Sequence, residues 1–592
     1  MVRPVPPYGG PDILQPHDSP DLELCMTLIS PSAEKTRIAV LVILALTFIA
    51  AGCSDDNNPC LPTPDDGGWT LPGSVSVSTQ EELDSLQGLR DISRSLTISF
   101  GEDIVDLTPL SRLKSVGGTL TIVGNPELES LAGLDSLESI WSLDLAANNQ
   151  LVSLAGLQNA DVHGRLAIHD NRALVSLNGL RSELSATQVV FWENPLLDDL
   201  EGLSQLPEAT WMTVDGHAGM SLAGLGATPK LAYLRLTGIN DVTGLGEPGD
   251  RPLLKELTIR SCAGLKNLSA IPSLSSLETL VIRENPDLES LGTLGDFDGL
   301  EWLDVSYNPQ LMDLGEITGM PNLKRLTVES NDSLVDCSGL PDISSLSYLT
   351  LQQNPGLKSL RGLGALPNLE RLGLNGLPSL EDLAGMTNLS GLEYLSLAGV
   401  GITTLQGLPD LPELRIFSVA GCPGLSNLAG CPDLPKVLDF DIRDCGGLTS
   451  LDGFPDLPTL SRLKLEDMTA LTTTRGVEAL TYISSVRFAD LPVLMSLEGL
   501  ANVVELKYFS MASCQSIADF EGLNALTTIG KEFAVLGNEA LADVSALTNV
   551  VDTEPLHVII RNNPNLDQCQ VEELVANWQY ESLTFGGNGP CQ

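Results

Sequence analysis

A unit of about 23 residues recurs about 21 times between Leu96 and Gln568, and this repeat leaves almost no room for any other kind of domain. The copy that begins at Leu120 reads LTIVGNPELESLAGL, and the copy that begins at Leu349 reads LTLQQNPGLKSLRGL. A fixed period in the range of roughly 20 to 29 residues with this spacing of leucines is typical of a solenoid. The repeat therefore constrains the architecture of almost the whole chain.

Each unit contains the pattern of a short strand followed by a turn. Leu120 and Ile122 alternate with Thr121 and Val123, which is the period-two pattern of a strand with one buried face. Asn125 then ends the strand, because its side chain can hydrogen-bond neighbouring backbone and it tolerates a tight turn. We expect the asparagines of successive units to stack as a ladder that satisfies buried turn amides. A single unit cannot bury its leucines alone, so stability must come from its neighbours.

The frame of these units resembles the leucine-rich-repeat family, whose consensus is L-x-x-L-x-L-x-x-N/C-x-L. More narrowly, Asn-Pro followed by Leu-x-Ser-Leu-x-Gly-Leu resembles the bacterial relatives of the receptor L domain. The consensus position holds Asn125, Asn148, Asn171, Asn194, Asn285, Asn308, Asn331, Asn354, Asn538 and Asn563, with Cys262, Cys422, Cys445 and Cys514 in four other coils. His217, Ile239, Leu377, Val400, Met468 and Leu491 depart from it. Those coils are expected to turn differently.

The resemblance implies a mostly β leucine-rich-repeat solenoid of about 21 coils, with a parallel sheet on the concave side. The second half of each unit is short and often carries proline, as in GLPDLP at 407–412 and GFPDLP at 453–458. Proline is excluded from the interior of a regular helix, so we expect little α-helix on the convex side. At about 4.8 Å per rung, the stack would form an arc on the order of 100 Å long.

Both ends of the repeat carry the signature of a short capping helix. At the N-terminal end, Thr79 and Glu82 have the spacing of a capping box. The segment 78–95 resembles the first helix of a receptor L domain and is expected to cover the first coil. The solenoid itself is then expected to span residues 96–563.

A second cap is expected at residues 564–592. Residues 570–578 are apolar at helical spacing, and Asp567 is placed to cap a helix there. Cys569 and Cys591 flank this helix. A disulfide between them would hold the helix over the last coil, and solenoids need such a terminal cap.

The other cysteines do not suggest a metal site. Six of them occupy inward consensus positions, where a free thiol behaves as a small hydrophobe: Cys262, Cys337, Cys422, Cys431, Cys445 and Cys514. None of these forms a C-x₂-C pair, so we expect no metal. Cys60 has no evident partner.

An apolar run of 14 residues, 38–51, lies just before Cys53 and follows Lys35 and Arg37. It is too short to span a bilayer and has the features of a signal-peptide core. The sequence IAAGC at its end resembles a bacterial lipobox, in which the cysteine receives diacylglycerol. We therefore expect a lipoprotein signal peptide at 26–52 and lipid attachment at Cys53. The alternative is an ordinary signal peptide or a stray apolar stretch.

The segments on either side of this leader are expected to have no fold of their own. Residues 1–25 are proline-rich and acidic, unlike any part of a signal peptide, which suggests a misassigned start. Residues 53–77 are rich in Asp, Pro and Gly and are expected to form a flexible tether. Ser54 replaces the aspartate that retains such lipoproteins at the inner membrane. The resemblance therefore implies a bacterial outer-membrane lipoprotein, facing the cell exterior or the periplasm.

The net charge of −45 restricts the partners of the chain. Such a surface repels nucleic acid and anionic lipid faces, so we expect no nucleic-acid partner and membrane contact only through the lipid. The acidity can also be explained by solubility or by tolerance of salt. A polycation or calcium is a further alternative, although no D-x-[DN]-x-[DN]-G loop is present.

Nothing in the sequence suggests catalysis. The chain has five histidines, and no H-E-x-x-H, G-x-S-x-G, Walker or G-x-G-x-x-G motif occurs in a suitable context. We therefore predict a protein that is not an enzyme and uses no cofactor. Three function classes remain: a recognition or adhesion module that binds protein or glycan on its concave face, a structural spacer of the envelope, and an accessory of a surface or secretion assembly. A monomer is expected in each case.

A stripe of large polar and aromatic residues favours the first class. The outward strand position after the second leucine-type residue holds His169, Trp192, Asp215, Thr237, Arg260 and Arg283 in successive coils, and Arg235 lies in the neighbouring column. Trp and Arg are enriched at binding hot spots. Farther along, the same column contains Ala398, Ala420, Ala489 and Ala512. We predict that a ligand meets the stripe in the N-terminal half, although exposed strand residues vary freely and the stripe could be accidental.

Overall fold

The structure is a computed structural model that describes residues 68–591 apart from positions 204, 218, 240, 241, 243, 244, 246–250, 318, 341 and 554. Contacts divide the chain into two compact units, Met1–Gly68 and Trp69–Gln592. The expected extension, the signal peptide, Cys53 and most of the tether lie outside the described residues. Among the helices of the described part, none has the length and apolar character needed to cross a bilayer.

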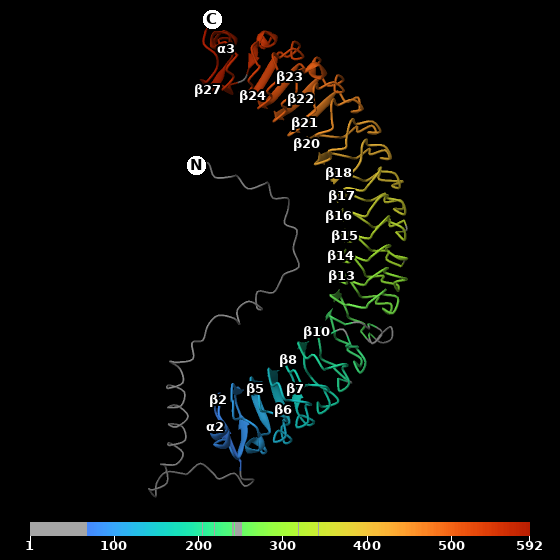
Figure 1. The fold of residues 1–592 in the computed structure, drawn as a ribbon, viewed down its shortest axis with the longest axis vertical. Coiled ribbons are helices and arrows are strands. Elements are labelled where there is room, and N and C mark those ends of the chain that lie inside the picture. Colours follow the sequence, from blue (N-terminus) through green and yellow to red (C-terminus); the bar gives the residue numbers. More distant parts are fainter. Residues whose placement is uncertain are drawn as a thin grey trace, which may run out of the picture. The chain divides into compact units, whose positions relative to one another are not determined.

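The unit Trp69–Gln592 contains a single parallel sheet whose strands stack one above another (Figure 1). Its strands are β1 Trp69–Leu71, β2 Val75–Val77, β3 Leu89–Ile92, β4 Leu96–Ser99, β5 Ser115–Val123, β6 Ser139–Ala146, β7 Asp161–Val162, β8 Arg165–His169, β9 Gln188–Trp192, β10 Trp211–Asp215, β11 Tyr233–Thr237, β12 Glu256–Arg260, β13 Thr279–Arg283, β14 Trp302–Ser306, β15 Arg325–Glu329, β16 Tyr348–Gln352, β17 Arg371–Leu377, β18 Tyr394–Val400, β19 Ile416–Ala420, β20 Asp439–Arg443, β21 Thr459–Glu466, β22 Tyr482–Ala489, β23 Glu505–Ala512, β24 Thr528–Leu536, β25 Asp552–Thr553, β26 Leu556–Arg561 and β27 Tyr580–Gly586. The described helices are α2 Gln80–Asp84 and α3 Gln568–Val575, with 3₁₀ turns η1 Thr108–Leu110, η3 Glu498–Leu500 and η4 Ser545–Leu547.

The register of the sheet repeats with the period of the sequence. Between β13 and β14, for example, all five pairs join residues 23 positions apart, from Thr279–Trp302 to Arg283–Ser306. The strands line the inner side of the curve in Figure 1, and the irregular second halves of the coils lie outside. The prediction of a mostly β leucine-rich-repeat solenoid with little α-helix is therefore confirmed.

The leucines of each unit form a continuous core between the strand and the outer half of the coil. Leu128, Leu131, Leu134 and similar residues of the other coils are fully buried. Gly133 shows how closely the coils stack, because its φ is 106° and an added Cβ would lie 2.3 Å from the carbonyl of Leu107 in the preceding coil. Only glycine fits such a backbone contact.

The asparagines form the predicted ladder. Asn308 donates its backbone N–H to Oδ1 of Asn331 at 3.1 Å, and its Nδ2 donates to the same oxygen at 3.2 Å. The same Nδ2 also donates to the carbonyl oxygen of Ile282 at 3.1 Å. These side chains are fully buried, so the ladder satisfies polar groups that water cannot reach. Equivalent bonds join the asparagines of three runs, which begin at Asn125, Asn285 and Asn538.

The tight turn itself is made by the residue before the ladder position, and not by the asparagine. Fourteen non-glycine residues of the described part have positive φ, and each directly precedes the ladder position of its coil, such as Tyr307 at 57° and Ser330 at 54°. A left-handed conformation costs an L-residue roughly 1–2 kcal/mol. The buried hydrogen bonds of the asparagine that follows offset this cost.

The prediction that coils without the ladder asparagine turn differently holds only in part, because Asp467 and Asp490 keep the left-handed turn before Met468 and Leu491. Strands β17 and β18 run two residues farther than β16, and Leu377 pairs with Val400 through the backbone. Backbone pairing thus replaces the side-chain ladder in these coils. Cysteine coils behave in a third way: the backbone N–H of Cys262 donates to Oδ1 of Asn285 at 3.0 Å, while its thiol donates to the carbonyl oxygen of Arg260 at 3.2 Å.

The N-terminal cap begins earlier than the sequence indicated. Strands β1 and β2 lie in the segment 53–77 that was expected to be a tether, and they pair with β3 and β4. Helix α2 follows, and the side chain of Thr79 accepts from the N–H of Glu82 at 3.2 Å. The Glu82 carboxylate accepts from the N–H of Ser78 at 2.7 Å. Two short strands and one helix turn therefore cover the first coil.

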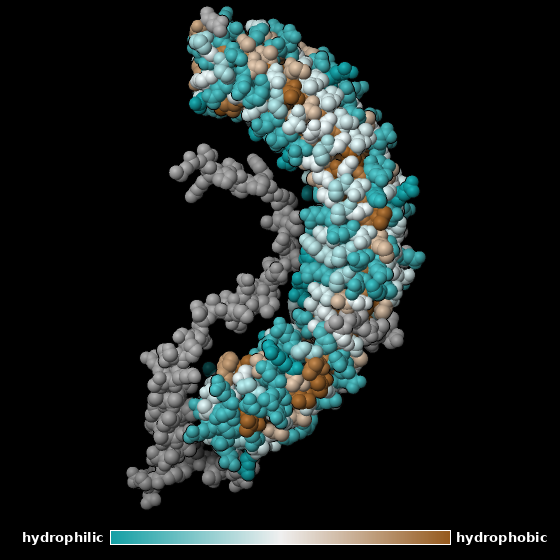
Figure 2. All heavy atoms as spheres, in the orientation of Figure 1, coloured by the Kyte–Doolittle hydropathy of each residue, from teal (hydrophilic) through white to brown (hydrophobic). Residues whose placement is uncertain are grey.

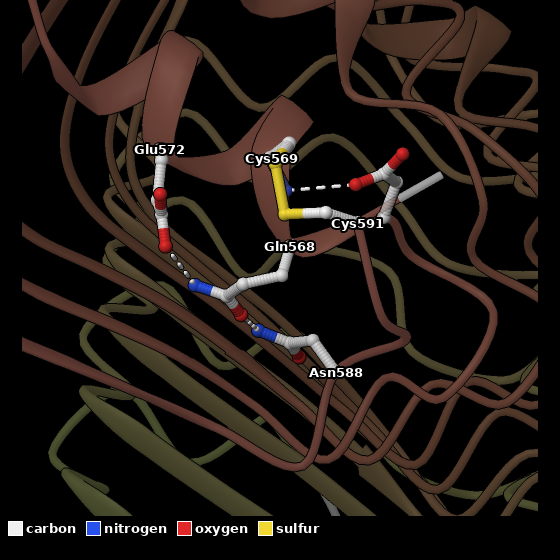
Figure 3. Close-up of a disulfide and its surroundings, with 6 residues drawn as sticks. Gln568, Cys569, Glu572, Asn588 and Cys591 are labelled. Atoms are coloured by element: carbon white, nitrogen blue, oxygen red, sulfur yellow. Dashed lines mark hydrogen bonds between the residues drawn. A yellow bond between two sulfur atoms is a disulfide. The ribbon is translucent and has the colours of Figure 1, made fainter.

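The C-terminal cap contains the expected helix and disulfide (Figure 3). The Asp567 side chain accepts from the N–H of Cys569 at 2.8 Å and caps α3. Cys569 is bonded to Cys591, with their Cα atoms 5.1 Å apart. Gln568 joins the two sides of the cap, because its side chain bonds to Glu572 at 3.2 Å and to Asn588 at 3.0 Å.

The solenoid extends beyond the expected boundary at residue 563. Strand β27 pairs with β26, and Asn563 donates its backbone N–H to Oδ1 of Asn588 at 3.2 Å. Asn588 is therefore one more member of the ladder. The repeat pattern did not reveal it because α3 replaces the leucine-bearing segment between these two asparagines. The C-terminal cap, with its disulfide, is therefore also the last coil of the solenoid.

The surface of this unit is mainly hydrophilic. Figure 2 shows hydrophilic residues over most of the visible face, with hydrophobic residues in small groups. Exposed large apolar side chains include Trp141 at 59% and Trp211 at 40%, both on the sheet. An isolated exposed apolar residue needs no functional explanation, but neighbouring aromatic residues on one face do.

Replacing a buried ladder asparagine should destabilise the stack strongly. In Asn331→Ala, the backbone N–H of Asn308 loses its acceptor inside the protein, which should cost about 1–3 kcal/mol of unfolding free energy. Asn331→Cys should cost less, because cysteine occupies this position in other coils. Denaturant unfolding would measure both. Asn322→Ala, which removes an exposed asparagine of the neighbouring turn, is the control; equal losses in Asn322→Ala and Asn331→Ala would contradict the ladder.

Breaking the disulfide should fray the last coils first. Solenoid stability is a sum over neighbouring coils, and losing a native disulfide costs roughly 2–5 kcal/mol. In Cys591→Ser or after reduction, hydrogen exchange should accelerate in residues 533–568 while the central coils remain protected. Unchanged protection in residues 533–568 would show that the disulfide does not hold the end of the solenoid.

Candidate functional site

The predicted stripe lies on the concave sheet as one column of adjacent side chains. His169 pairs with Trp192, Asp215 with Thr237, and Thr237 with Arg260, in neighbouring strands. Arg260 in turn pairs with Arg283. Arg235 lies one column away, between Thr213 and Thr258. Because neighbouring strands are about 4.8 Å apart, these side chains form a continuous strip from β8 to β13.

His169 and Trp192 form the most ordered part of the stripe. Their rings stack with centroids 3.7 Å apart and an interplanar angle of 12°. His169 also contacts Asp170 through Nδ1 at 2.7 Å and Asp144 through Nε2 at 3.2 Å. Burial alone would lower the pKa of His169, but the hydrogen bonds to these two carboxylates raise the pKa above its ordinary value. The stacked rings are therefore fixed in place before any ligand arrives.

Carboxyl groups extend this cluster. The Glu193 carboxyl hydrogen-bonds to Asp170, and this contact raises the pKa of Glu193. Asp215 lies exposed at the end of β10, and desolvation by its neighbours raises its pKa against the opposing charge of Arg260. The N-terminal end of the stripe is consequently acidic, with aromatic rings beside it.

The arginines of the stripe are less free than the sequence suggested. Arg260 makes two hydrogen bonds to the Glu284 carboxylate, at 2.8 and 2.9 Å, and this pairing lowers the pKa of Glu284. The guanidinium of Arg283 lies over the ring of Tyr307, 5.0 Å from its centroid. The expected basic cluster is therefore partly neutralised. The sequence could not show this, because Glu284 occupies the turn position outside the strand.

The side chains of the same column do not all become small toward the C-terminus. After Gln352 it continues through Asn375, Ala398, Ala420, Arg443, Glu466, Ala489 and Ala512. Arg443 pairs with Asp441 at 3.6 Å. Two pairs of alanines thus flank two charged residues, and the contrast between the two halves is weaker than predicted.

The structure reveals a second column that sequence reasoning missed. The first residue of each strand, just before the first leucine-type residue, is aromatic or arginine in much of the central sheet. Trp211 and Tyr233 are adjacent there, with ring centroids 5.2 Å apart. Farther along, five consecutive strands present what we term the aromatic–arginine column: Trp302, Arg325, Tyr348, Arg371 and Tyr394. Aligning the repeats at this position would have shown the column.

Three of the buried cysteines, Cys262, Cys337 and Cys514, are held as thiols by their surroundings. Burial raises the pKa of Cys262 to about 11 and that of Cys337 to about 12, so both remain thiols. Burial likewise raises the pKa of Cys514 to about 12. One group with metal-ligand spacing occurs among the described residues, namely Asp567, Cys569 and Cys591, but its two sulfurs form the disulfide.

Comparison with known proteins supports no closer assignment. No protein-family model matches the chain, and no curated protein matches it. Similar solved structures include a TLR13–ssRNA13 complex (16% identity, 87% of this chain and 90% of that chain, TM-score 0.26) and YopM from Yersinia enterocolitica (17%, 92% and 99%, TM-score 0.29). Another is the mouse RP105/MD-1 complex (16%, 85% and 88%, TM-score 0.31). At these scores the neighbours do not indicate what this chain binds.

The fold is established by the chain itself. The 23-residue register, the continuous parallel sheet and the buried asparagine ladder are the defining features of one architecture. The chain therefore has the fold of a leucine-rich-repeat solenoid.

Proposed function

We propose that this protein is a non-catalytic recognition or adhesion module, anchored to the bacterial cell surface, that binds a protein or glycan on its concave face. The observation that carries the proposal is the set of fixed aromatic and arginine side chains on that face. Trp, Tyr and Arg are the residue types enriched at binding hot spots. A ligand meeting side chains that are already ordered loses less conformational entropy on binding.

The N-terminal stripe is our candidate contact surface. His169 and Trp192 present a stacked pair beside the Asp144 and Asp170 carboxylates. Flat rings next to hydrogen-bonding groups suit either a sugar or an aromatic side chain of a partner. Arg260 would contribute less than a free arginine, because Glu284 already holds its guanidinium.

Anchoring at Cys53 is a separate part of the proposal. The lipobox-like sequence IAAGC and the apolar leader before it support a lipid-bearing cysteine, and the absence of aspartate at position 54 supports the outer membrane. The lipid would hold a monomeric solenoid at the membrane, with the binding face directed to the exterior or the periplasm. Anchoring by several acyl chains is far stronger than by one.

Cys53→Ala should block lipid attachment and processing. The precursor should then accumulate with its leader uncleaved, and globomycin, which inhibits the lipoprotein signal peptidase, should have the same effect. Mass spectrometry of the N-terminus and membrane fractionation would measure the result. A mature protein that begins at Ser54 without lipid would show that the leader is an ordinary signal peptide.

Substitutions in the stripe should weaken ligand binding. After a screen of surface proteins and glycans with the purified full chain, Trp192→Ala should reduce affinity for the partner by about tenfold or more, as expected for a hot-spot residue. Arg260→Ala should have a smaller effect, because its charge is already paired. Arg443→Ala, at the same column position in a distant coil, is the control. If all three variants bind alike, the stripe is not the contact surface; a screen without any partner would favour a structural spacer.

A further inference from the structure

The aromatic–arginine column is built as a stack of alternating rings and cations. The guanidinium of Arg325 lies between two rings, 5.8 Å from the centroid of Trp302 and 5.4 Å from that of Tyr348. The guanidinium of Arg371 lies 5.8 Å from the ring centroid of Tyr394. Guanidinium groups stack well on aromatic faces, so both long side chains are held in place by their neighbours.

Neither arginine has a carboxylate partner among the described residues. Elsewhere on this acidic chain, cations at neighbouring positions are paired: Lys324 with Glu301 at 2.6 Å, and Arg462, in the same column at β21, with Asp439 at 3.5 Å. Arg325 and Arg371 are instead fixed by rings, which leaves the N–H groups on their edges without an anionic acceptor. A guanidinium held in this way can bind the carboxylate of a ligand through charge-assisted hydrogen bonds.

A row of small residues, which we term the trough, runs beside the column. The next outward position of the same strands holds the small residues Thr327, Thr350, Gly373 and Ser396. The far side of the trough is formed by Glu329, Gln352 and Asn375. The Glu329 carboxylate is already bound by Tyr307 and Gln352, each at 3.3 Å. Hydroxyl and amide groups therefore follow one another along the solenoid axis.

The spacing of the two arginines distinguishes between polymers that could lie in this trough. They are two strands apart, which places them about 10 Å from each other. In an extended peptide, side chains on one face recur at about 6.6 Å, so successive carboxylates would not match. A β-linked sugar chain repeats every two sugars, over a length close to two rungs. Its hydroxyl groups would also satisfy the polar lining of the trough.

We propose that the trough beside the aromatic–arginine column binds a linear acidic polysaccharide with one carboxylate per disaccharide. Arg325 and Arg371 each receive one uronate carboxylate from successive disaccharides. The ring edges of Tyr348 and its neighbours contact the sugars between them, and the threonine and serine hydroxyls bond to sugar hydroxyls. This inference rests on the proposed recognition function of the concave face. It adds the class of ligand that the central coils of the solenoid bind.

The acidic residues of the convex side do not prevent this binding. Charges on exposed residues are screened beyond about 8 Å at physiological ionic strength, so carboxylates on the convex side act weakly on a ligand in the trough. Association should still weaken with added salt, because the attraction at the site is itself electrostatic.

The test is calorimetric titration of the full chain with three probes of matched length. These are an oligosaccharide of alternating glucuronic acid and N-acetylglucosamine, an uncharged chito-oligosaccharide, and an oligoglutamate peptide. Only the first should bind well. Arg325→Gln and Arg371→Gln should each weaken its binding by about tenfold, which is the range for loss of a charge-assisted hydrogen-bonded pair. Arg462→Gln is the matched control and should bind normally.

Each remaining outcome overturns the proposal. Equal binding of the uncharged sugar, unaffected by the arginine substitutions, would exclude the carboxylate contacts. Equal binding of oligoglutamate would exclude a sugar-specific trough, and failure of the uronate probe would remove the ligand class. The proposed recognition function is tested separately. It is supported if a screen finds a partner that the Arg325→Gln and Arg371→Gln variants still bind normally. It is contradicted if no partner binds the concave face. Circular dichroism of each variant would show that the fold is intact.

Discussion

The hydrogen bonds of the buried asparagine ladder are the interaction on which the rest of the structure depends. Each coil of about 23 residues must reverse direction at the end of its strand, and it does so with a left-handed residue directly before the ladder position. That turn leaves backbone amides inside the protein without a regular partner. Oδ1 of the asparagine in the next coil accepts from them, as Asn331 does for Asn308. The strained turn of one coil is thus stabilised by the following coil.

This dependence fixes the register of the sheet and, through it, the arrangement of the concave surface. Because the asparagines within each run bond to their equivalents in the neighbouring coil, equivalent outward residues of those coils also lie side by side. His169 stacks on Trp192, and Arg325 lies between Trp302 and Tyr348, for this reason. Binding surfaces on this protein are therefore columns along the solenoid axis. A ligand that is itself long and periodic matches such a surface better than a compact one.

The sequence predicted the features that repeat and missed those that depend on contacts between unlike positions. The leucine period and the recurring asparagines were sufficient to predict the solenoid and its ladder, and the cysteines that flank the predicted terminal helix indicated the disulfide between Cys569 and Cys591. It could not show Asn588, because α3 replaces the usual leucines before it. Strands β1 and β2 carry no repeat, so their segment was taken for a tether.

The sequence predicted where the residues of the candidate site lie, but it did not predict which charges among them are paired. The stripe from His169 to Arg283 does lie on one face, but Glu284 neutralises Arg260 from a turn that strand periodicity does not describe. The aromatic–arginine column lies at the position before the first leucine-type residue, which the period-two pattern of a strand does not distinguish from the other outward positions. Its significance comes from the stacking distances, which a sequence does not contain.

Residue-resolved hydrogen exchange tests the central claim most directly. If the ladder closes the turns, the backbone amides of Asn285, Asn308 and Asn331, each bonded to an asparagine side chain, should exchange only when the stack itself opens. Their protection should then equal that of strand amides in the same coils. Exchange of these amides orders of magnitude faster than that of the strand amides would contradict the account, because it would show that the turns open independently of the sheet.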